Sequence, residues 1–96
     1  MTPSSSTPDE IRQILFRVFQ PLHLEIFDDS ARHAGHSGAK KGGGHYRVIL
    51  VSVSFQGQGL LERHRRVKEA LKDFFGAKIH ALQLSVFTPE EWSLKK

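Results

Sequence analysis

The sequence predicts an α+β fold in which helices cover one face of a three-stranded mixed sheet, with the element order αββααβα. Three observations predict this class. Apolar residues recur at helical spacing in two segments, three other segments have strand character, and a threonine-proline-acid-acid pattern that opens helices occurs twice. Because helices connect the second strand to the third, that crossover should be right-handed and the pair parallel. The first two strands are joined only by a loop and should be antiparallel.

The first half of the chain predicts one helix and two strands. Residues 7–10 read as a capping box with Thr7 as the cap and Pro8 at the first helical position, and Pro21 stops the helix. The apolar residues between them lie at helical spacing: Ile11, Ile14, Leu15, Val18 and Phe19. Residues 22–28 alternate as a strand. Residues 45–54 form a longer strand that is apolar on both faces, which is typical of a central position.

The second half predicts helices, a strand and a last helix. Glycines at 57 and 59 break the chain, and Leu60 and Leu61 form a short turn of helix. A longer helix follows over residues 64–75, with Gly76 as its stop, which gives a helix-turn-helix outline. Residues 78–87 alternate as the third strand. The capping pattern at residues 88–91 opens a short final helix that carries Trp92.

Length and composition indicate one domain, expected over residues 8–93, with a disordered lead-in over 1–7 and a tail over 94–96. No apolar run approaches the length of a membrane span, so no membrane association is expected. The N-terminal segment is polar and soon acidic, unlike a signal or transit peptide. The expected compartment is the cytoplasm, with the mitochondrion as an alternative in a eukaryote.

The chain has no cysteine and six histidines. A disulfide, a thiol nucleophile and a thiolate metal site built by this chain alone are therefore excluded. Soft-metal chemistry would use imidazole, with thiolates supplied by another molecule. The net charge of +4 and the pI near 9.8 favour an anionic partner, either nucleic acid or an acidic protein surface.

Between the first two strands, residues 29–44 show no periodicity and are rich in glycine. This segment contains His33 and His36. A loop of this length is usually functional or disordered. The spacing of its two histidines is compatible with a chelate, although that pattern in a glycine-rich loop has low specificity.

Three ordered stretches resemble the BolA family. Residues 60–67 carry Arg-His-Arg-x-Val, residues 79–82 read Ile-His-Ala-Leu, and residues 45–48 read His-Tyr-Arg-Val ahead of Val51 and Ser52. Residues 25–33 also resemble the family's first strand and loop opening. The resemblance extends over about residues 9–92 and implies a BolA-like fold related to the class II KH module.

That resemblance implies a non-enzymatic adaptor, monomeric when isolated, that forms a heterodimer with a monothiol glutaredoxin and shares a 2Fe–2S cluster. Glutaredoxin and glutathione would supply thiolates, and no cofactor is expected in the isolated chain. His80 matches the family's third-strand ligand and His33 its loop ligand, with His36 as the alternative. The loop here is longer and richer in glycine than in the shortest members, and residues 42–44 are glycines where many members have an acidic residue.

The histidines also have structural interpretations. His80 is in phase with the apolar residues of its strand, so it could be a partly buried residue bonded to backbone. His64 is expected to be a structural residue in the turn. His23 and His45 are expected to be surface or packing residues.

The alternative function is that of a DNA-binding transcriptional regulator. A basic helix carries Arg63, Arg65, Arg66 and Lys68, candidates for contact with nucleic acid or an acidic partner. The competing interpretation is a solvated basic face. The Gly-x-x-Gly loop of KH domains is absent between the helices. An enzyme is not expected, since no paired carboxylates and no nucleophile beside a base can be identified.

Overall fold

The computed structural model describes residues 6–29 and 44–95. In chain order the elements are α1 (Thr7–Phe19), β1 (His23–Asp28), β2 (Gly44–Val51), α2 (Leu60–Ala70), β3 (Ile79–Phe87) and α3 (Pro89–Lys95). Short 3₁₀ turns occupy Val53–Phe55 and Lys72–Phe74. No helix in the described part of the chain is long and apolar enough to cross a membrane.

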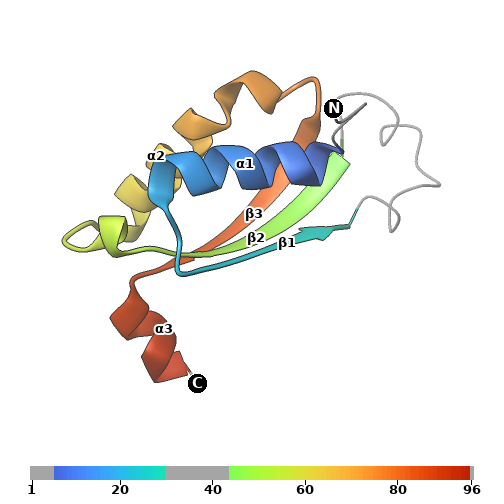
Figure 1. The fold of residues 1–96 in the computed structure, drawn as a ribbon. Helices are drawn as coiled ribbons and strands as arrows, with labels where there is room; N and C mark the ends of the chain where they lie inside the picture. Colours follow the sequence, from blue (N-terminus) through green and yellow to red (C-terminus); the bar gives the residue numbers. More distant parts are fainter. Residues whose placement is uncertain (1–5, 30–43, 96) are drawn as a thin grey trace.

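The three strands form one sheet in the order β1-β2-β3. β1 pairs antiparallel with β2, and β2 pairs parallel with β3. The α+β class, the central position of the second strand and both strand orientations are thus confirmed. Helices α1 and α2 lie side by side on one face of this sheet (Figure 1).

The core lies between that helical layer and the sheet. Its fully buried members come from β2 and β3, from α1, from α2 and its C-cap, and from the first 3₁₀ turn: Ile11, Leu15, Val48, Leu50, Phe55, Val67, Leu71 and Ile79. Ser52, also buried, donates a hydrogen bond from Oγ to the carbonyl of Phe19 at 2.7 Å and so fixes the end of α1 to the end of β2.

Helix α3 lies on the other side of the sheet from α1 and α2 (Figure 1), so the expectation that all helices share one face is wrong for this element. Its Trp92 ring stacks on His23 of β1, with centroids 4.9 Å apart, and lies 5.4 Å from Phe87. The capping box predicted for this helix is confirmed. The backbone N–H of Glu91 donates to Oγ1 of Thr88 at 3.2 Å, and the N–H of Thr88 donates back to Oε1 of Glu91 at 3.0 Å.

Two sequence predictions about helix boundaries are wrong. The cap of α1 is Ser6, whose side chain accepts from the N–H of Asp9 at 3.3 Å, while Thr7 is already helical. Leu60 and Leu61 are the first residues of α2, whose N-cap is Gly59, and do not form a separate helix. The helix-turn-helix outline is therefore absent from this region, because no break separates Leu61 from the helical residues that follow it.

Candidate metal centre

A β-bulge at the start of β3 determines where His80 lies. Gly44 of β2 pairs with Ile79, but the next residue, His45, pairs with Ala81, so His80 is an extra residue on β3. Strict alternation from Leu82 would direct His80 toward the core. Instead Ile79 is fully buried and His80 is exposed. A bulge commonly redirects a side chain in this way.

The bulge places the His80 ring beside that of His45. The two ring centroids are 5.1 Å apart and the ring planes are inclined by 45°. His45 is half-buried at the start of β2, and the two strands run parallel, so both histidines lie at the same end of the sheet. From the sequence, His45 was expected to be a surface or packing residue. The signal was available, because a parallel pair brings the two strand starts together.

Ion pairs and backbone contacts fix the surroundings of this histidine pair. The Nε–H of Arg47 donates to Oδ2 of Asp29 at 2.6 Å, and the Arg47 guanidinium lies 4.5 Å from the centroid of the Phe27 ring. The N–H of Asp29 donates to the carbonyl of His45 at 2.8 Å. A hollow of about 190 Å³ between β2 and β3 is lined by His45, Arg47 and Asp29 together with Tyr46, Ala81, Leu82 and Gln83.

The predicted loop ligands His33 and His36 lie outside the described residues, as do residues 30–43 as a whole. The two described residues that flank this segment both lie at the histidine pair. Asp29 is bonded to His45, and the N–H of Gly44 donates to the carbonyl of Lys78 at 3.0 Å. Within residues 6–29 and 44–95, no group of three or more His, Cys, Asp or Glu side chains could hold a metal ion.

The basic residues of α2 divide into two kinds. Arg63 is 6% exposed, and its guanidinium donates to both carboxylate oxygens of Glu91 at 2.7 and 3.1 Å and to the carbonyl of Gln58 at 2.8 Å. Arg63 therefore joins α2 to α3 and has no surface to offer a partner, so its predicted contact role is replaced by a structural one. Arg65 and Lys68 are exposed.

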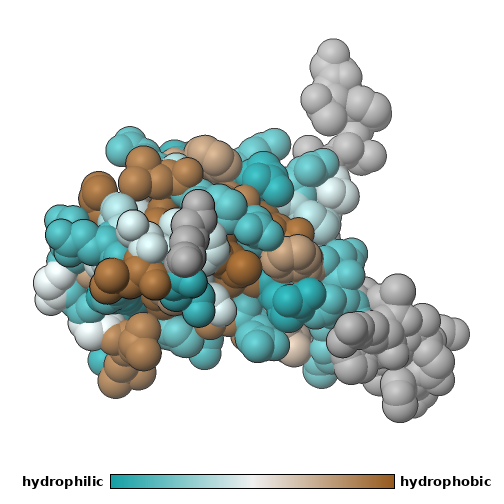
Figure 2. All heavy atoms as spheres, turned by 90° about the horizontal axis from the view of Figure 1, so that it is seen from below, coloured by the Kyte–Doolittle hydropathy of each residue, from teal (hydrophilic) through white to brown (hydrophobic). Residues whose placement is uncertain are grey.

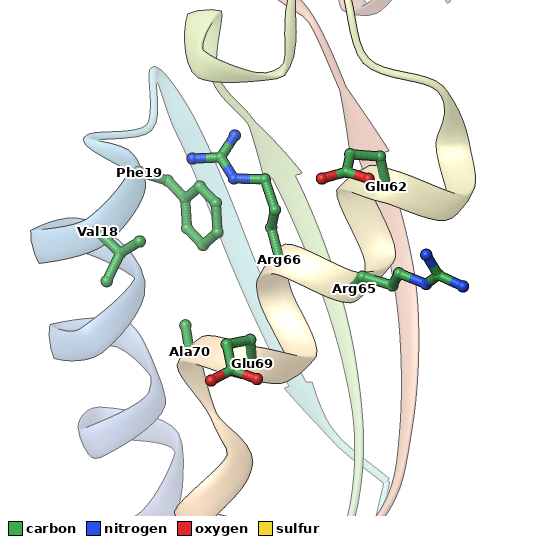
Figure 3. Close-up of a pocket in the computed structure, with 7 residues that line it drawn as sticks. All are labelled: Val18, Phe19, Glu62, Arg65, Arg66, Glu69 and Ala70. Carbon is green, nitrogen blue, oxygen red and sulfur yellow. The ribbon is translucent and has the colours of Figure 1, made fainter.

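Arg66 is half-buried in a groove of about 470 Å³ between α1 and α2 (Figure 3). Its guanidinium donates to the carbonyl of Ser54 and to the side chain of Gln58, both at 2.9 Å, and lies 5.0 Å from the Phe19 ring centroid. In Figure 3 the side chain of Arg66 extends toward Phe19, whereas that of Arg65 points away from α1.

The bidentate pair with Arg63 changes the acidity of Glu91. Hydrogen bonds from the Arg63 guanidinium, followed by the backbone N–H of Thr88, lower the pKa of Glu91 from its ordinary 4.5 to about 2. Glu91 thus remains ionised in all but strongly acidic solution. Its charge stabilises the fold through the ion pair with Arg63.

The family model described as BolA-like protein matches residues 15–91. The chain belongs to the BolA family. It is 37% identical to a BolA-like protein of Dictyostelium discoideum over 93 residues, which is 96% of this chain and 79% of the relative.

Two further relatives extend this comparison. The chain is 37% identical to the DNA-binding transcriptional regulator BolA of Escherichia coli, over 88% of this chain and 77% of that protein. Among solved structures, BolA1 from Arabidopsis thaliana superposes with a TM-score of 0.80 at 32% identity, over 92% of this chain and 97% of that one. The fold and family expected from the three sequence stretches are confirmed.

Proposed function

We propose that this BolA-family chain is a non-enzymatic adaptor that binds a monothiol glutaredoxin and contributes imidazole ligands to a shared 2Fe–2S cluster. The observation that carries the proposal is the exposed His80, which the bulge keeps out of the core. A fully buried histidine could not reach the metal of a partner. His80 is presented to solvent at one end of the sheet, beside the points where the chain leaves and re-enters the described structure.

The residues present fit a shared cluster better than one held by this chain alone. A 2Fe–2S cluster takes four protein or thiol ligands, most often thiolates, and histidine in place of cysteine raises its potential. This chain has no cysteine. It can therefore supply imidazole only, and the thiolates would come from the glutaredoxin and glutathione.

For the second imidazole we retain His33, with His36 as the alternative. His33 is four residues after Asp29, a stretch of chain that spans at most roughly 14 Å. Because Asp29 is bonded to the backbone of His45, that reach includes the region around His80. The cluster, when bound, would supply electron-transfer and cluster-transfer chemistry, while this chain would position the imidazoles and provide the docking surface.

The test is reconstitution with a monothiol glutaredoxin, glutathione, iron and sulfide. The proposal predicts a one-to-one heterodimer whose visible absorption and circular dichroism differ from those of the glutaredoxin homodimer. The His33→Ala and His36→Ala variants then identify the loop ligand, since only the ligand's removal changes the spectrum. Mixtures that yield only the homodimer spectrum would refute the proposal.

DNA binding is the weaker alternative. It is motivated by the name of the Escherichia coli relative and by the exposed Arg65 and Lys68. Two of the four basic residues predicted for it, Arg63 and Arg66, are engaged within the chain. The remaining charges favour non-specific attraction to phosphate over base readout.

A further inference from the structure

We propose that His45 and His80 form a two-imidazole chelate for a single borderline divalent cation such as Zn²⁺. The proposal is independent of the adaptor function, because it needs no partner protein, no glutathione and no residue outside the described structure. It rests on the geometry of two side chains that the bulge at the start of β3 brings together.

The separation of the two rings is compatible with one shared ion. Zn–N bonds to imidazole are about 2.0–2.1 Å long, so two histidines on a tetrahedral ion hold their ring centroids about 5 Å apart. The observed separation of the His45 and His80 centroids is 5.1 Å. Bringing both rings onto one cation therefore requires rotation of the rings and little movement of the strands.

The backbone that carries these rings is well fixed, which lowers the entropy cost of chelation. His45 is in register with Ala81 of the neighbouring strand, and its carbonyl accepts from the N–H of Asp29. The position before it is held as well, by the hydrogen bond from Gly44 to Lys78. Each imidazole has two ring nitrogens, so one can bind the ion while the other keeps a protein contact.

The charges nearest the pair also permit a cation. A basic side chain lies two positions from each histidine: Arg47 after His45 and Lys78 before His80. Each is paired with a carboxylate, Arg47 with Asp29 at 2.6 Å and Lys78 with Glu10 at 2.7 Å. Their repulsion of a bound ion is thereby reduced. Imidazole suits Zn²⁺, Cu²⁺ and Ni²⁺ and disfavours Mg²⁺ and Ca²⁺, which prefer oxygen.

The experiment is a Zn²⁺ titration of the isolated full chain, followed by isothermal calorimetry and by the ring ¹⁵N–¹H signals of the histidines in NMR. We expect one ion per chain, with the ring signals of His45 and His80 moving together and those of His23 unchanged. His45→Gln and His80→Gln should each weaken binding at least about tenfold. Mg²⁺ should produce no response.

Two variants control for other histidines. His23→Gln is the matched control on the same sheet, and the double variant His33→Gln/His36→Gln removes the loop histidines. Both should bind Zn²⁺ with unchanged affinity. Loss of binding in the double variant with retention in His45→Gln would overturn the proposal, and so would signals in which only one ring of the pair responds. Because no glutaredoxin is present, failure here leaves the adaptor proposal intact, and failure of cluster reconstitution leaves this proposal intact.

Discussion

At the scale of single residues, burial separates arginines that look equivalent in the sequence. Arg63 and Arg65 are two positions apart on α2, yet Arg63 is buried against Glu91 and Arg65 is exposed. The sequence predicted the helix, and Val67 and Leu71 on its inner face are fully buried. It could not predict Arg63 as their neighbour on that face, because the carboxylate that compensates its charge comes from α3, 28 residues later.

The Glu91 carboxylate makes stability depend on acidity. Its pKa in the folded chain is about 2 against an ordinary 4.5, so its contribution is fully present above about pH 4.5 and is lost as the pH falls toward 2. Glu91→Gln keeps the capping geometry but removes the charge. We expect a loss of about 1 kcal/mol at pH 7, a modest figure because Glu91 is half-exposed.

Urea unfolding at pH 7 and at pH 2.5 measures this difference. The difference in the free energy of unfolding between wild type and Glu91→Gln should be smaller at pH 2.5 than at pH 7. Glu90→Gln, in the same first turn of α3, is the control and should change stability by less than about 0.5 kcal/mol at both values. An equal loss for the two variants at pH 7 would mean that Arg63 gains nothing specific from Glu91.

At the scale of elements, the start of β3 shows most clearly what periodicity can and cannot predict. Alternation correctly predicted the strand, on which Leu82, Leu84 and Val86 pack against the core. Extended backward, the same alternation predicted His80 as inward, but the bulge assigns that place to Ile79. A bulge adds one residue to a strand, and the hydrophobic pattern does not reveal it. The apolar residues Ile79 and Leu82 are each compatible with an inward position, whether or not an extra residue lies between them.

Because Ile79 is buried and His80 is exposed, substitutions at these adjacent positions should have very different effects on stability. Ile79→Ala should reduce the free energy of unfolding by about 3 kcal/mol, since it leaves a cavity at a fully buried position. His80→Ala should change it by less than about 0.5 kcal/mol, because the side chain is exposed. Chemical denaturation of both variants is the measurement, and a large loss for His80→Ala would show that His80 is part of the core.

The other errors also lie at element boundaries. Thr7 and Ser6 are both good caps, and residue spacing does not decide between them. Leu60 and Leu61 were predicted to form a separate turn of helix, but no break separates them from the residues that follow. Gly57, with φ of +79°, makes the turn, and Gly59 caps a single helix. The parallel pairing of β2 with β3 was nevertheless predicted correctly, because it depends on the presence of a helix between the strands and not on where the helix begins.

At the scale of the whole molecule, the sheet has two unlike faces. The face opposite α1 and α2 shows hydrophobic side chains in separate patches with hydrophilic ones between them (Figure 2). The histidine pair lies at one end of this sheet. Trp92 packs on His23 at the opposite end, where His23 pairs with Val51, the last residue of β2. The proposed metal chemistry is therefore separated from the contact that holds α3.

The net positive charge predicts a measurable but non-specific affinity for DNA. Duplex binding should fall steeply with salt and show no sequence preference, and Arg65→Ala or Lys68→Ala should each reduce the salt slope by about one. Titrations of several duplexes at a series of salt concentrations test this. A strong preference for one sequence that survives at physiological salt would instead support the regulator alternative.

The candidate metal centre, which includes His80 and His45, could be predicted only in part. His80 was identified through the family resemblance, and its exposure now supports its candidacy. His45 was overlooked because its significance depends on a neighbouring strand. His33 and His36 remain predictions. The most direct measurement is the visible circular dichroism of the complex reconstituted with a monothiol glutaredoxin, compared for wild type, His80→Ala and the control His23→Ala.

For that measurement the adaptor account predicts a heterodimer spectrum for wild type and His23→Ala. His80→Ala should fold normally but give an altered spectrum and a cluster that is lost several-fold faster. A spectrum and cluster lifetime unchanged by His80→Ala would contradict the central claim.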